Sequence, residues 1–544
     1  MNILAVIPAR GNSKGIPRKN MRLLNGRPLI FYCIQTARKC SAITHIVVSS
    51  DDSEILEYAQ EMGVIALQRS ESLSKDDTTL DPVVYDATVR AEEMLSKRFD
   101  YIVTLQPTSP NLSTISLGKA LEVTIGSEVD TMLSVVNKPC LSWRREGSSI
   151  LPNYSNRLNR QLLPDNYVEA GAFIICKRLS LTPKSRIGTF VNVYELSEQE
   201  GSDIDTIEEW VLSEALIKRK RIAFRADGDR QLGMGHIYRC LTLAYSLTGH
   251  EICFISNKNH PVGVEKLKNS FFTCYEIESD DDTHTLVKQI KPDILVMDVL
   301  NTEKNFVMKL KENVERLITF EDMGTGTDVA DAVINSLFSN KDNRSHVYTG
   351  YKFADLRDEF LLKNPKNFST KVENVFIMFG GADPANYTKK CYDMICNNIE
   401  VFKGIKFNIV AGLAYDSVQS KILDRPDDGV YVFNNSSKVS WFMQQADLAI
   451  TSQGRSTFEL ASLAVPSIVM AQNQREKSHG FASLENGFLN LGFGRDITEE
   501  TLLKTLIWLI DTPQMRSEMR EIMLGLDIRK GINRVKQIIL GESI

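Results

Sequence analysis

The sequence lacks the features that mark membrane, nucleic-acid-binding and disulfide-bonded proteins. No stretch approaches the ~18 consecutive apolar residues of a membrane-spanning helix, and the short apolar run at the N-terminus has no basic segment before it, as a signal peptide would. The 64 Lys and Arg against 69 Asp and Glu leave a net charge of -5, which offers no general surface to nucleic acid or to an anionic membrane. The 9 cysteines form no C-x-x-C pair, which favours reduced, buried thiols. We therefore expect a soluble, cytoplasmic protein with no membrane or nucleic-acid partner.

What the sequence does contain is an alternation of strand-like and helix-like segments. Its composition is ordinary for a globular protein, with 43% hydrophobic and 24% charged residues. A length of 544 residues is too great for one core and predicts three or four folding units. Short apolar runs such as 3–7 and 101–105 alternate with segments of helical periodicity such as 81–96. This order predicts the α/β class, with a doubly wound, mostly parallel sheet that binds ligands at the carboxyl ends of its strands.

A second opening of the same kind indicates a domain boundary near residue 220. The apolar run 222–227 leads into a Gly-rich segment and then a helical one, as at the N-terminus. Another strand-like run, 375–381, follows a polar, proline-containing stretch. Together these signals predict a domain at 1–220 and two Rossmann-like lobes, 221–365 and 366–544, that face a cleft.

The loop after the first strand combines glycines with four basic side chains. It covers residues 8–20 and includes Gly11 and Gly15. Backbone N–H groups near a helix start, together with Arg and Lys side chains, are what a triphosphate requires. The loop has neither the ending of a Walker A loop nor the spacing of a dinucleotide-binding loop. A basic surface turn remains the alternative to a nucleotide site.

The same loop resembles the signature of the N-acylneuraminate cytidylyltransferases, the CMP-sialic acid synthetases. The resemblance extends along residues 1–215, through S-S-D-D at 49–52, L-Q-P-T-S-P at 105–110 and S-D-I-D-T at 202–206. It implies transfer of CMP from CTP to a nonulosonic, sialic-acid-like acid, with pyrophosphate as the second product, and it favours a homodimer. It also implies a CTP site in which Arg10 and Lys19 hold phosphates and act in catalysis, and whose members are Arg10, Gly11, Ser13, Lys19, Asn20, Ser50 and Gln106.

Two carboxylates, Asp203 and Asp205, form a candidate metal site. They stand two positions apart, so on an extended segment both project to one side and can offer oxygens to Mg²⁺. From spacing alone, capping of the helix that starts near Ile207, by Asp205 or Thr206, is an equal alternative. The resemblance favours the metal, with Asp205 catalytic, and Mg²⁺ screening charge as the sugar's anomeric hydroxyl attacks the α-phosphorus. The sequence identifies no general base.

One departure from the family concerns the sugar. The chain reads V-E-A-G-A-F at 168–173, where relatives commonly have N-G-A, so sialic, legionaminic and pseudaminic acids all remain open. The candidate sugar-binding residues are Gln106, Arg157, Arg160 and Glu169. The two arginines could pair with the sugar carboxylate, or they could be ordinary surface residues.

The second half resembles a different family. The segment 225–240, with G-M-G-H at 233–236, is similar to the N-terminal signature of the UDP-sugar hydrolase of pseudaminic acid synthesis and its spore-coat relatives, which have the GT-B fold. Further similarity lies at 379–384 and 451–459. The resemblance implies a site for a UDP-linked deoxyamino sugar, with UDP bound by Gly235, Gly380, Gly454, Ser456, Thr457 and Glu459.

Physical reasoning supports two parts of that site. The turn from Gly454 to Thr457 offers backbone donors to a diphosphate, and Glu459 could accept hydrogen bonds from ribose, although a capping box of Ser456 with Glu459 is the alternative. His236 follows a Gly-x-Gly turn at a strand end and is the candidate catalytic base, because imidazole can take a proton from an attacking water at neutral pH. Its alternative role is to bond phosphate or to cap a helix.

These observations leave three hypotheses for the second half. It hydrolyses a UDP-sugar of the same pathway, which makes the chain bifunctional. Alternatively it is a glycosyltransferase, or a catalytically silent module that binds nucleotide sugars or promotes oligomerisation.

Overall fold

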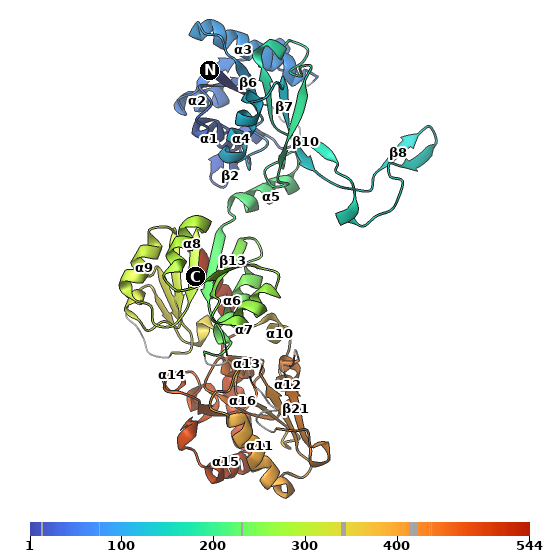
Figure 1. Cartoon of the computed structure of the whole chain (residues 1–544). Helices are drawn as coiled ribbons and strands as arrows, with labels where there is room; N and C mark the ends of the chain where they lie inside the picture. Colours follow the sequence, from blue (N-terminus) through green and yellow to red (C-terminus); the bar gives the residue numbers. More distant parts are fainter. Residues whose placement is uncertain are drawn as a thin grey trace. The chain divides into compact units, whose positions relative to one another are not determined.

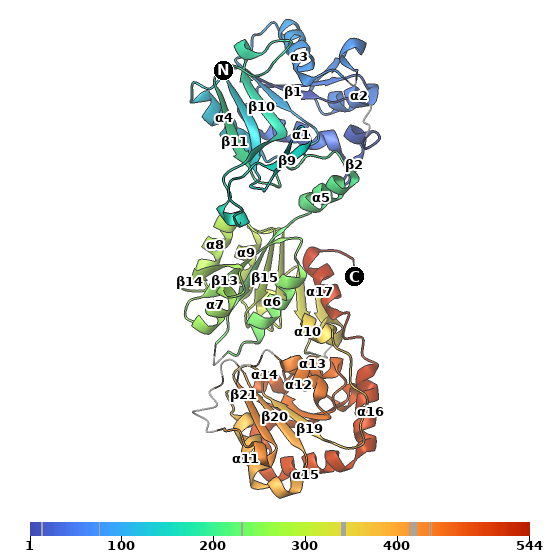
Figure 2. The same cartoon turned by 90° about the vertical axis from the view of Figure 1, so that its right-hand side faces the viewer.

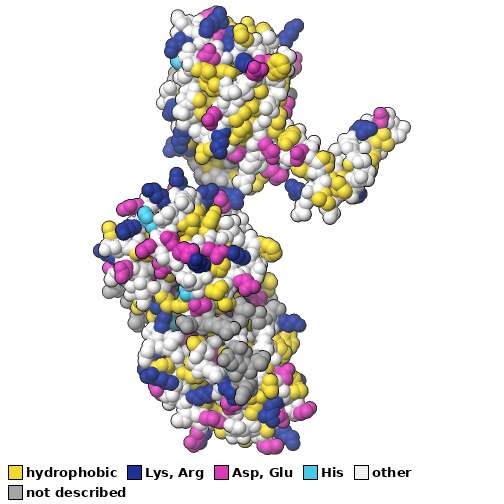
Figure 3. All heavy atoms as spheres, viewed as in Figure 1, with side chains coloured by type: hydrophobic (Ala, Val, Ile, Leu, Met, Phe, Trp, Pro, Cys, Tyr) yellow, Lys and Arg dark blue, Asp and Glu magenta, His cyan; other side chains and the backbone are white. Residues whose placement is uncertain are grey.

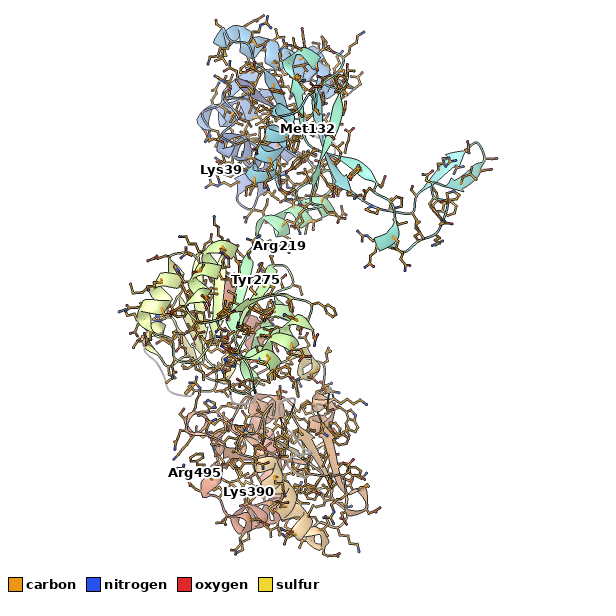
Figure 4. All side chains as sticks on the ribbon, in the orientation of Figure 1. Lys39, Met132, Arg219, Tyr275, Lys390 and Arg495 are labelled. Carbon is orange, nitrogen blue, oxygen red and sulfur yellow. The ribbon has the colours of Figure 1, made fainter. Side chains whose placement is uncertain are left out.

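The chain divides into two units, Met1–Arg219 and Lys220–Ile544, in the computed structural model. Figure 1 follows them along the sequence, and Arg219, the last residue of the first unit, is labelled in Figure 4. No helix among the described residues is long and apolar enough to cross a membrane. The structure describes residues 1–11, 15–75, 77–229, 232–338, 344–412, 415, 422–434, 436 and 438–543.

The N-terminal unit is built on a seven-stranded sheet with the order β11-β7-β10-β6-β1-β4-β5. Strand β10 runs antiparallel to β6 and β7, and the other neighbours pair in parallel. The strands are β1 (Ile3–Pro8), β4 (His45–Ser50), β5 (Ile65–Gln68), β6 (Tyr101–Leu105), β7 (Thr131–Asn137), β10 (Tyr167–Lys177) and β11 (Val191–Leu196), with a small hairpin of β2 (Leu23–Leu24) and β3 (Arg27–Pro28).

Helices cover both faces of this sheet. Ile34, Ala59 and Leu117 bring three helices into the core on one face, and Val84 and Ala91 bring a fourth into the core on the other. Met132 of β7, labelled in Figure 4, is buried in the first of these cores. The helices, in chain order, are α1 (Leu29–Lys39), α2 (Ser53–Glu61), α3 (Leu80–Leu95), α4 (Thr114–Ile125) and α5 (Ile207–Ile217).

Between β7 and β10 the chain leaves the sheet as an arm, residues 139–165. The arm carries a two-stranded hairpin, β8 (Trp143–Glu146) and β9 (Ser149–Pro152), all of whose residues are exposed. Figures 1 and 3 show it projecting from its unit, with hydrophobic side chains on its surface. An isolated hairpin of this kind is only marginally stable in water, so the arm has little to hold it within its own unit.

The second unit begins with a lobe whose sheet is entirely parallel, in the order β14-β13-β12-β15-β16-β17-β18. Its strands are β12 (Arg221–Ala226), β13 (Glu251–Asn257), β14 (Thr273–Ile277), β15 (Ile294–Asp298), β16 (Arg316–Phe320), β17 (Ala332–Asn335) and β18 (Val347–Thr349). Its helices are α6 (Gly235–Ser246), α7 (Pro261–Lys268), α8 (Asp282–Ile290) and α9 (Lys304–Lys311). The short α10 (Asp358–Leu361) follows, and its Phe360 is buried in a core with Phe376 and Phe458 of the second lobe.

The second lobe repeats this plan with six parallel strands in the order β21-β20-β19-β22-β23-β24. Its strands are β19 (Asn374–Met378), β20 (Lys406–Ala411), β21 (Val430–Asn434), β22 (Leu448–Ser452), β23 (Ser467–Ala471) and β24 (Phe488–Phe493). Its helices are α11 (Tyr387–Asn397), α12 (Val439–Gln445), α13 (Ser456–Ser462), α14 (Gln474–Lys477), α15 (Glu499–Asp511) and α16 (Pro513–Leu524). The prediction of an α/β fold with mostly parallel sheets is confirmed in both halves.

The strand orders locate the sites. In each lobe the chain starts in the middle of the sheet, at β12 or β19, winds outward to one edge and then returns to fill the other side. Ligands of such sheets bind outside the carboxyl ends of the two strands between which the winding reverses. Those strands are β12 and β15 in the first lobe and β19 and β22 in the second; β1 and β6 correspond to them in the N-terminal unit.

One domain prediction needs correction. We expected all of residues 366–544 in the second lobe, but the last helix, α17 (Gly531–Leu540), packs against the first. Its residues Ile532, Val535 and Ile538 lie in the same core as Phe224 of β12, and Figure 2 shows it beside that sheet. The apolar spacing identifies the helix as amphipathic but not which sheet it covers.

Candidate functional site

The N-terminal site starts with the loop after β1, which runs close to two acidic segments. The Gly11 N–H donates to Asp51 Oδ1 at 2.9 Å, and Asn20 Nδ2 donates to the Arg10 carbonyl at 2.8 Å. A Cβ on Gly11 would lie 2.5 Å from Asp52 Oδ2, and one on Gly15 would lie 2.4 Å from the Asp205 carbonyl. Only glycine therefore permits this approach. Ser13, a predicted CTP contact, lies outside the described residues.

Two other predicted CTP residues, Ser50 and Lys19, are buried beside this loop. The Ser50 hydroxyl, at the end of β4, accepts the Asp52 N–H at 3.0 Å. Lys19 Nζ donates to the Ile204 carbonyl at 2.7 Å and to Asp205 Oδ1 at 2.9 Å. Lys19 therefore ties the loop to the predicted metal segment, and its contact with phosphate stays a prediction.

Around Asp203 several buried oxygens have no partner. Thr108 Oγ1, Ser109 Oγ and Asp203 Oδ1 form no hydrogen bond within the described ranges. The Ile204 N–H donates to the Thr108 carbonyl at 2.9 Å, which brings the two segments together. Burial raises the pKa of the Asp203 carboxyl and the negative charge of Asp205 adds to this, whereas the nearby Thr108 hydroxyl and the charge of Lys19 lower it by less. By geometry, the described residues therefore leave these three oxygens without a hydrogen-bond partner.

The alternative role for this segment is capping of α5, and the residue that caps this helix is Thr206. Thr206 is the N-cap, and its side chain accepts the Glu209 N–H at 3.3 Å in a capping box with Glu209. Asp203 and Asp205 are therefore not used as caps. They differ in exposure, because the Asp205 side chain is 71% exposed while an oxygen of Asp203 is buried.

The predicted sugar residues lie in two places: Gln106 and Glu169 are near Gly171 of β10, and the two arginines are on the arm. Gln106 lies against Gly171, which has a φ of +70°, and a Cβ there would sit 3.1 Å from Gln106 Nε2. Glu169 is exposed on β10, two positions before that glycine. Arg157 and Arg160 lie exposed on the arm, where Arg160 forms a 3.4 Å ion pair with Glu198.

In the second unit, a cavity of about 610 Å³ is lined by residues from both lobes. Five of the six predicted UDP-binding residues line it: Gly235, Gly380, Gly454, Ser456 and Glu459. Thr457 does not, because it is buried and donates its hydroxyl to the Gly454 carbonyl at 2.7 Å. The cavity thus lies where the strand orders of the two lobes place a ligand.

The wall of this cavity in the first lobe carries His236 near the start of α6. His236 Nδ1 lies 2.6 Å from Asp298 Oδ1, and Asp298 is fully buried at the end of β15. Arg239 donates to both oxygens of Asp298, at 2.6 Å each. Burial alone would raise the pKa of Asp298, but Arg239 and His236 hold it below its ordinary value. Since an ionised carboxylate only accepts hydrogen bonds, Nδ1 carries the proton and Nε2 of the neutral ring is an acceptor.

On the side of the second lobe, ion pairs surround the predicted UDP turn. Arg455 donates to both oxygens of Asp355, at 2.7 and 2.6 Å. Glu459 accepts from Arg357 Nε at 2.9 Å. The N-cap of α13 is Arg455, with no side-chain cap, so the capping box of Ser456 and Glu459 does not form.

Sequence reasoning missed several residues that line this cavity or support it. Asp298 and Glu321 each follow an apolar strand run, a position at which a sequence could flag them. Arg475 and Glu476 lie on α14 and carry no such signal. Burial raises the pKa of Glu476 to about 7, although the Gln472 N–H donates to its carboxylate at 2.8 Å.

Known proteins match both halves of the chain. A family model described as cytidylyltransferase matches residues 4–139. The CMP-N,N'-diacetyllegionaminic acid synthase of Legionella pneumophila is 33% identical over 40% of this chain and 97% of its own length. The spore coat polysaccharide biosynthesis protein SpsG of Bacillus subtilis is 24% identical over 58% of this chain and 96% of its own length, a share too large to lie within the first unit alone.

A third relative, an uncharacterized protein of Methanocaldococcus jannaschii, is 30% identical over 47% of this chain. The chain spans 57% of the length of that relative. The match to nearly the whole legionaminic acid synthase, together with the family model, decides the assignment: through its N-terminal unit, the chain belongs to the cytidylyltransferase family.

Proposed function

We propose that the N-terminal unit transfers CMP from CTP to a nonulosonic acid, giving a CMP-sugar and pyrophosphate. The observation that carries this proposal is the group of buried, unpartnered oxygens on Thr108, Ser109 and Asp203, beside the segment that Gly15 contacts. Membership of the cytidylyltransferase family supports CTP as the nucleotide. Similarity to a CMP-N,N'-diacetyllegionaminic acid synthase supports a sugar acid of this class as the acceptor.

Mg²⁺ fits the donor set of this site. Carboxylate and hydroxyl oxygens are its preferred protein ligands, and Asp203 Oδ1 is one that the described residues leave unsatisfied. Asp203 and Asp205 would hold the ion, which when bound would screen the charge of the triphosphate. Lys19 fixes the position of Asp205, and Gly11 and Gly15 leave the loop backbone open to phosphate oxygens.

The chain's own groups suggest how the sugar is held. Gln106 reaches over Gly171 at the end of β6, next to the proposed nucleotide site, and it is the sugar contact that we favour. Arg157 and Arg160 stand on the exposed arm, so a role for them requires the arm to pack against another surface.

The test is a screen of sialic, legionaminic and pseudaminic acids with the full chain, CTP and Mg²⁺, with detection of pyrophosphate. Asp205→Asn should largely abolish pyrophosphate release, because an amide holds Mg²⁺ far less well than a carboxylate. Arg10→Ala should mainly raise the CTP requirement. Absence of pyrophosphate with all three acids would refute the proposal, and near-normal activity of Asp205→Asn at saturating Mg²⁺ would refute the metal role.

For the second unit we propose hydrolysis of a UDP-linked deoxyamino sugar. Three features support it: the cavity between the lobes, the Gly454 turn on one wall and the His236–Asp298 pair on the other. His236 Nε2 takes a proton from water while the water oxygen bonds to the anomeric carbon. The bond between that carbon and the phosphate oxygen breaks, which releases UDP and the free sugar.

A glycosyltransferase would use the same cavity and the same base, with a hydroxyl of an acceptor in place of water. A catalytically silent module would only bind the nucleotide sugar. Turnover of UDP-sugars with and without an acceptor separates the three. Release of free sugar without an acceptor supports hydrolysis, whereas a strict acceptor requirement supports transfer. His236→Ala should remove turnover and leave UDP binding and CMP transfer intact, because losing a base lowers kcat more than affinity. Hydrolysis by this variant at the parental rate would contradict the assignment of the base.

We also propose that two copies of the chain associate through the arm. Trp143, Ile150 and Leu162 on the arm are 55, 57 and 67% exposed, and a lone hairpin needs a partner to be stable. A second copy would cover these side chains. Light scattering tests this: Trp143→Asp with Ile150→Asp should convert a dimer to monomers, and a monomeric parent would refute the idea.

A further inference from the structure

Glu321 stands at the wall of the cavity with one carboxylate oxygen unpaired. It follows β16, lines the cavity and is 4% exposed. Its Oε1 accepts hydrogen bonds from Ser336 Oγ at 2.9 Å and from the Leu337 N–H at 3.3 Å. Its Oε2 is buried and accepts no hydrogen bond from the described part of the chain. The described residues thus satisfy one oxygen of this carboxylate and leave the other, which is buried, without a donor.

The backbone at Glu321 is also strained. Its φ is +48°, in the left-handed region that side chains other than glycine rarely adopt. Arg475 of α14 donates to the Glu321 carbonyl, so a residue of the second lobe braces this conformation. A buried unpaired oxygen and a left-handed backbone are each unfavourable, and such features gather at ligand sites. Their coincidence at one residue of a cavity wall points to binding.

Two neighbouring carboxylates differ from Glu321 in this respect. Asp298 is fully engaged by His236 and Arg239. Asp322 accepts from the Thr302 N–H, from the Thr302 hydroxyl and from the Gly324 N–H, at 3.0, 2.5 and 2.8 Å. Within the described ranges, Glu321 is the only one of these three carboxylates that has an oxygen without a donor.

Charge indicates which part of a ligand faces this oxygen. A carboxylate repels a diphosphate, and the turn proposed for the diphosphate, at Gly454, belongs to the other lobe. Glu321 instead shares its wall with the proposed base, because Arg239 bonds to Asp298 and its Nη1 lies 3.4 Å from Glu321 Oε1. The reacting sugar must lie near that base. A ligand group that pairs with this oxygen must therefore belong to the part of the ligand that is uncharged and rich in N–H and O–H donors.

We propose that Glu321 Oε2 accepts a hydrogen bond from a ring hydroxyl or acylamino N–H of the sugar, and so selects the glycosyl part of the UDP-sugar. This rests on the proposed function of the second unit. A site built to bond a substrate N–H or O–H discriminates strongly against ligands that lack it, because the buried acceptor is then left unpaired. Glu321 thus contributes to affinity for the sugar and not to affinity for UDP.

The test compares UDP with UDP-N-acetylglucosamine as probes, by calorimetry on the full chain. Glu321→Gln keeps an oxygen for Ser336 and Leu337 and replaces the open acceptor with an N–H donor. We expect its Kd for UDP-N-acetylglucosamine to rise about tenfold or more, while its Kd for UDP changes less than twofold. Its melting temperature should fall, because the buried Arg239 loses an ion-pair partner, so the ratio of the two Kd values and not the stability is the readout. Asp322→Asn is the matched control and should keep the parental ratio of the two Kd values.

Every outcome decides a question. Equal weakening of both probes makes Glu321 a structural residue and overturns the inference, and so does no change in either. A parent that binds UDP but gains nothing from the attached sugar also overturns it. A parent that binds neither probe refutes the proposed function of the second unit instead.

Discussion

Two aspartates, one in each unit, show how the same side chain can be prepared for different chemistry. Asp203 of the N-terminal unit has a buried oxygen that accepts no hydrogen bond from the described residues, and burial raises its pKa. Asp298 of the second unit is more deeply buried, yet Arg239 and His236 hold its pKa below the ordinary value. Where the chain supplies its own cation, the carboxylate is a fixed support for another residue. Asp203 has no such pair of hydrogen bonds from an arginine among the described residues, and we propose that it binds Mg²⁺.

The largest effect that we expect comes from Asp298→Asn. An asparagine can turn its N–H toward His236 Nδ1 and force the other tautomer, and in comparable carboxylate–imidazole pairs this change lowers kcat by about 10⁴. We expect UDP-sugar hydrolysis to fall by about 10³-fold or more, with UDP affinity and CMP transfer nearly unchanged. Steady-state kinetics and calorimetry measure both. A parental kcat would break the comparison, since Asp298 would then support structure alone.

Removal of the proposed metal should lower the activity of the N-terminal unit only. Asp203→Asn is expected to lower CMP transfer by about 100-fold, and chelation of Mg²⁺ should stop it, while UDP-sugar hydrolysis continues because its cations belong to the chain. Pyrophosphate release and sugar release, assayed on one preparation, provide the check. Loss of both activities on chelation would show that the two sites do not differ in this way.

Glu476 extends the comparison within the second unit, because it forms no ion pair with the described residues and its pKa is about 7. For a carboxyl whose folded pKa is raised, stability is fully present below the unfolded pKa, here 4.5, and is lost as pH rises through about 7. At about 1.4 kcal/mol per pKa unit, reduced for partial exposure, the loss is about 2 kcal/mol. Urea unfolding of Glu476→Gln from pH 4.5 to 8 should lack this decline; a slope equal to the parent's would contradict it.

The smallest effect concerns the cap that leaves the N-terminal aspartates free. Thr206→Ala removes the capping bond to Glu209 and should lower the unfolding free energy of the first unit by about 1 kcal/mol. Thr206→Ser is the matched control and should restore most of it. If Asp205→Ala produced the larger loss of stability, with little effect on CMP transfer, the assignment of cap and metal ligand would be reversed.

The site residues that the sequence could group without the structure lie within one loop, and their binding of CTP stays a prediction. Arg10, Asn20 and Gly11 follow one strand, and a strand that ends in a Gly-rich basic loop is readable without a partner. Asp298 was missed because it stands 62 positions from His236, and no local pattern joins them. Thr457 was assigned to the wrong environment, since spacing does not tell whether a hydroxyl faces a ligand or its own turn. Contacts within one loop can be predicted from adjacent residues, whereas pairs of residues on different strands and helices depend on how the whole chain packs.

Because α17 packs against the first lobe, the core of this lobe can be completed only after nearly the whole chain has been synthesised. The N-terminal unit has all its residues once Arg219 has left the ribosome, but the core around Phe224 waits for a helix near the end of the chain. Arg316 and Ile538, joined by a hydrogen bond, are 222 positions apart. At roughly 5–20 residues per second, translation of that interval takes on the order of ten to forty seconds. During that time the surface of the first lobe that α17 covers has no partner from α17, so we expect the second unit to need chaperones more than the first does.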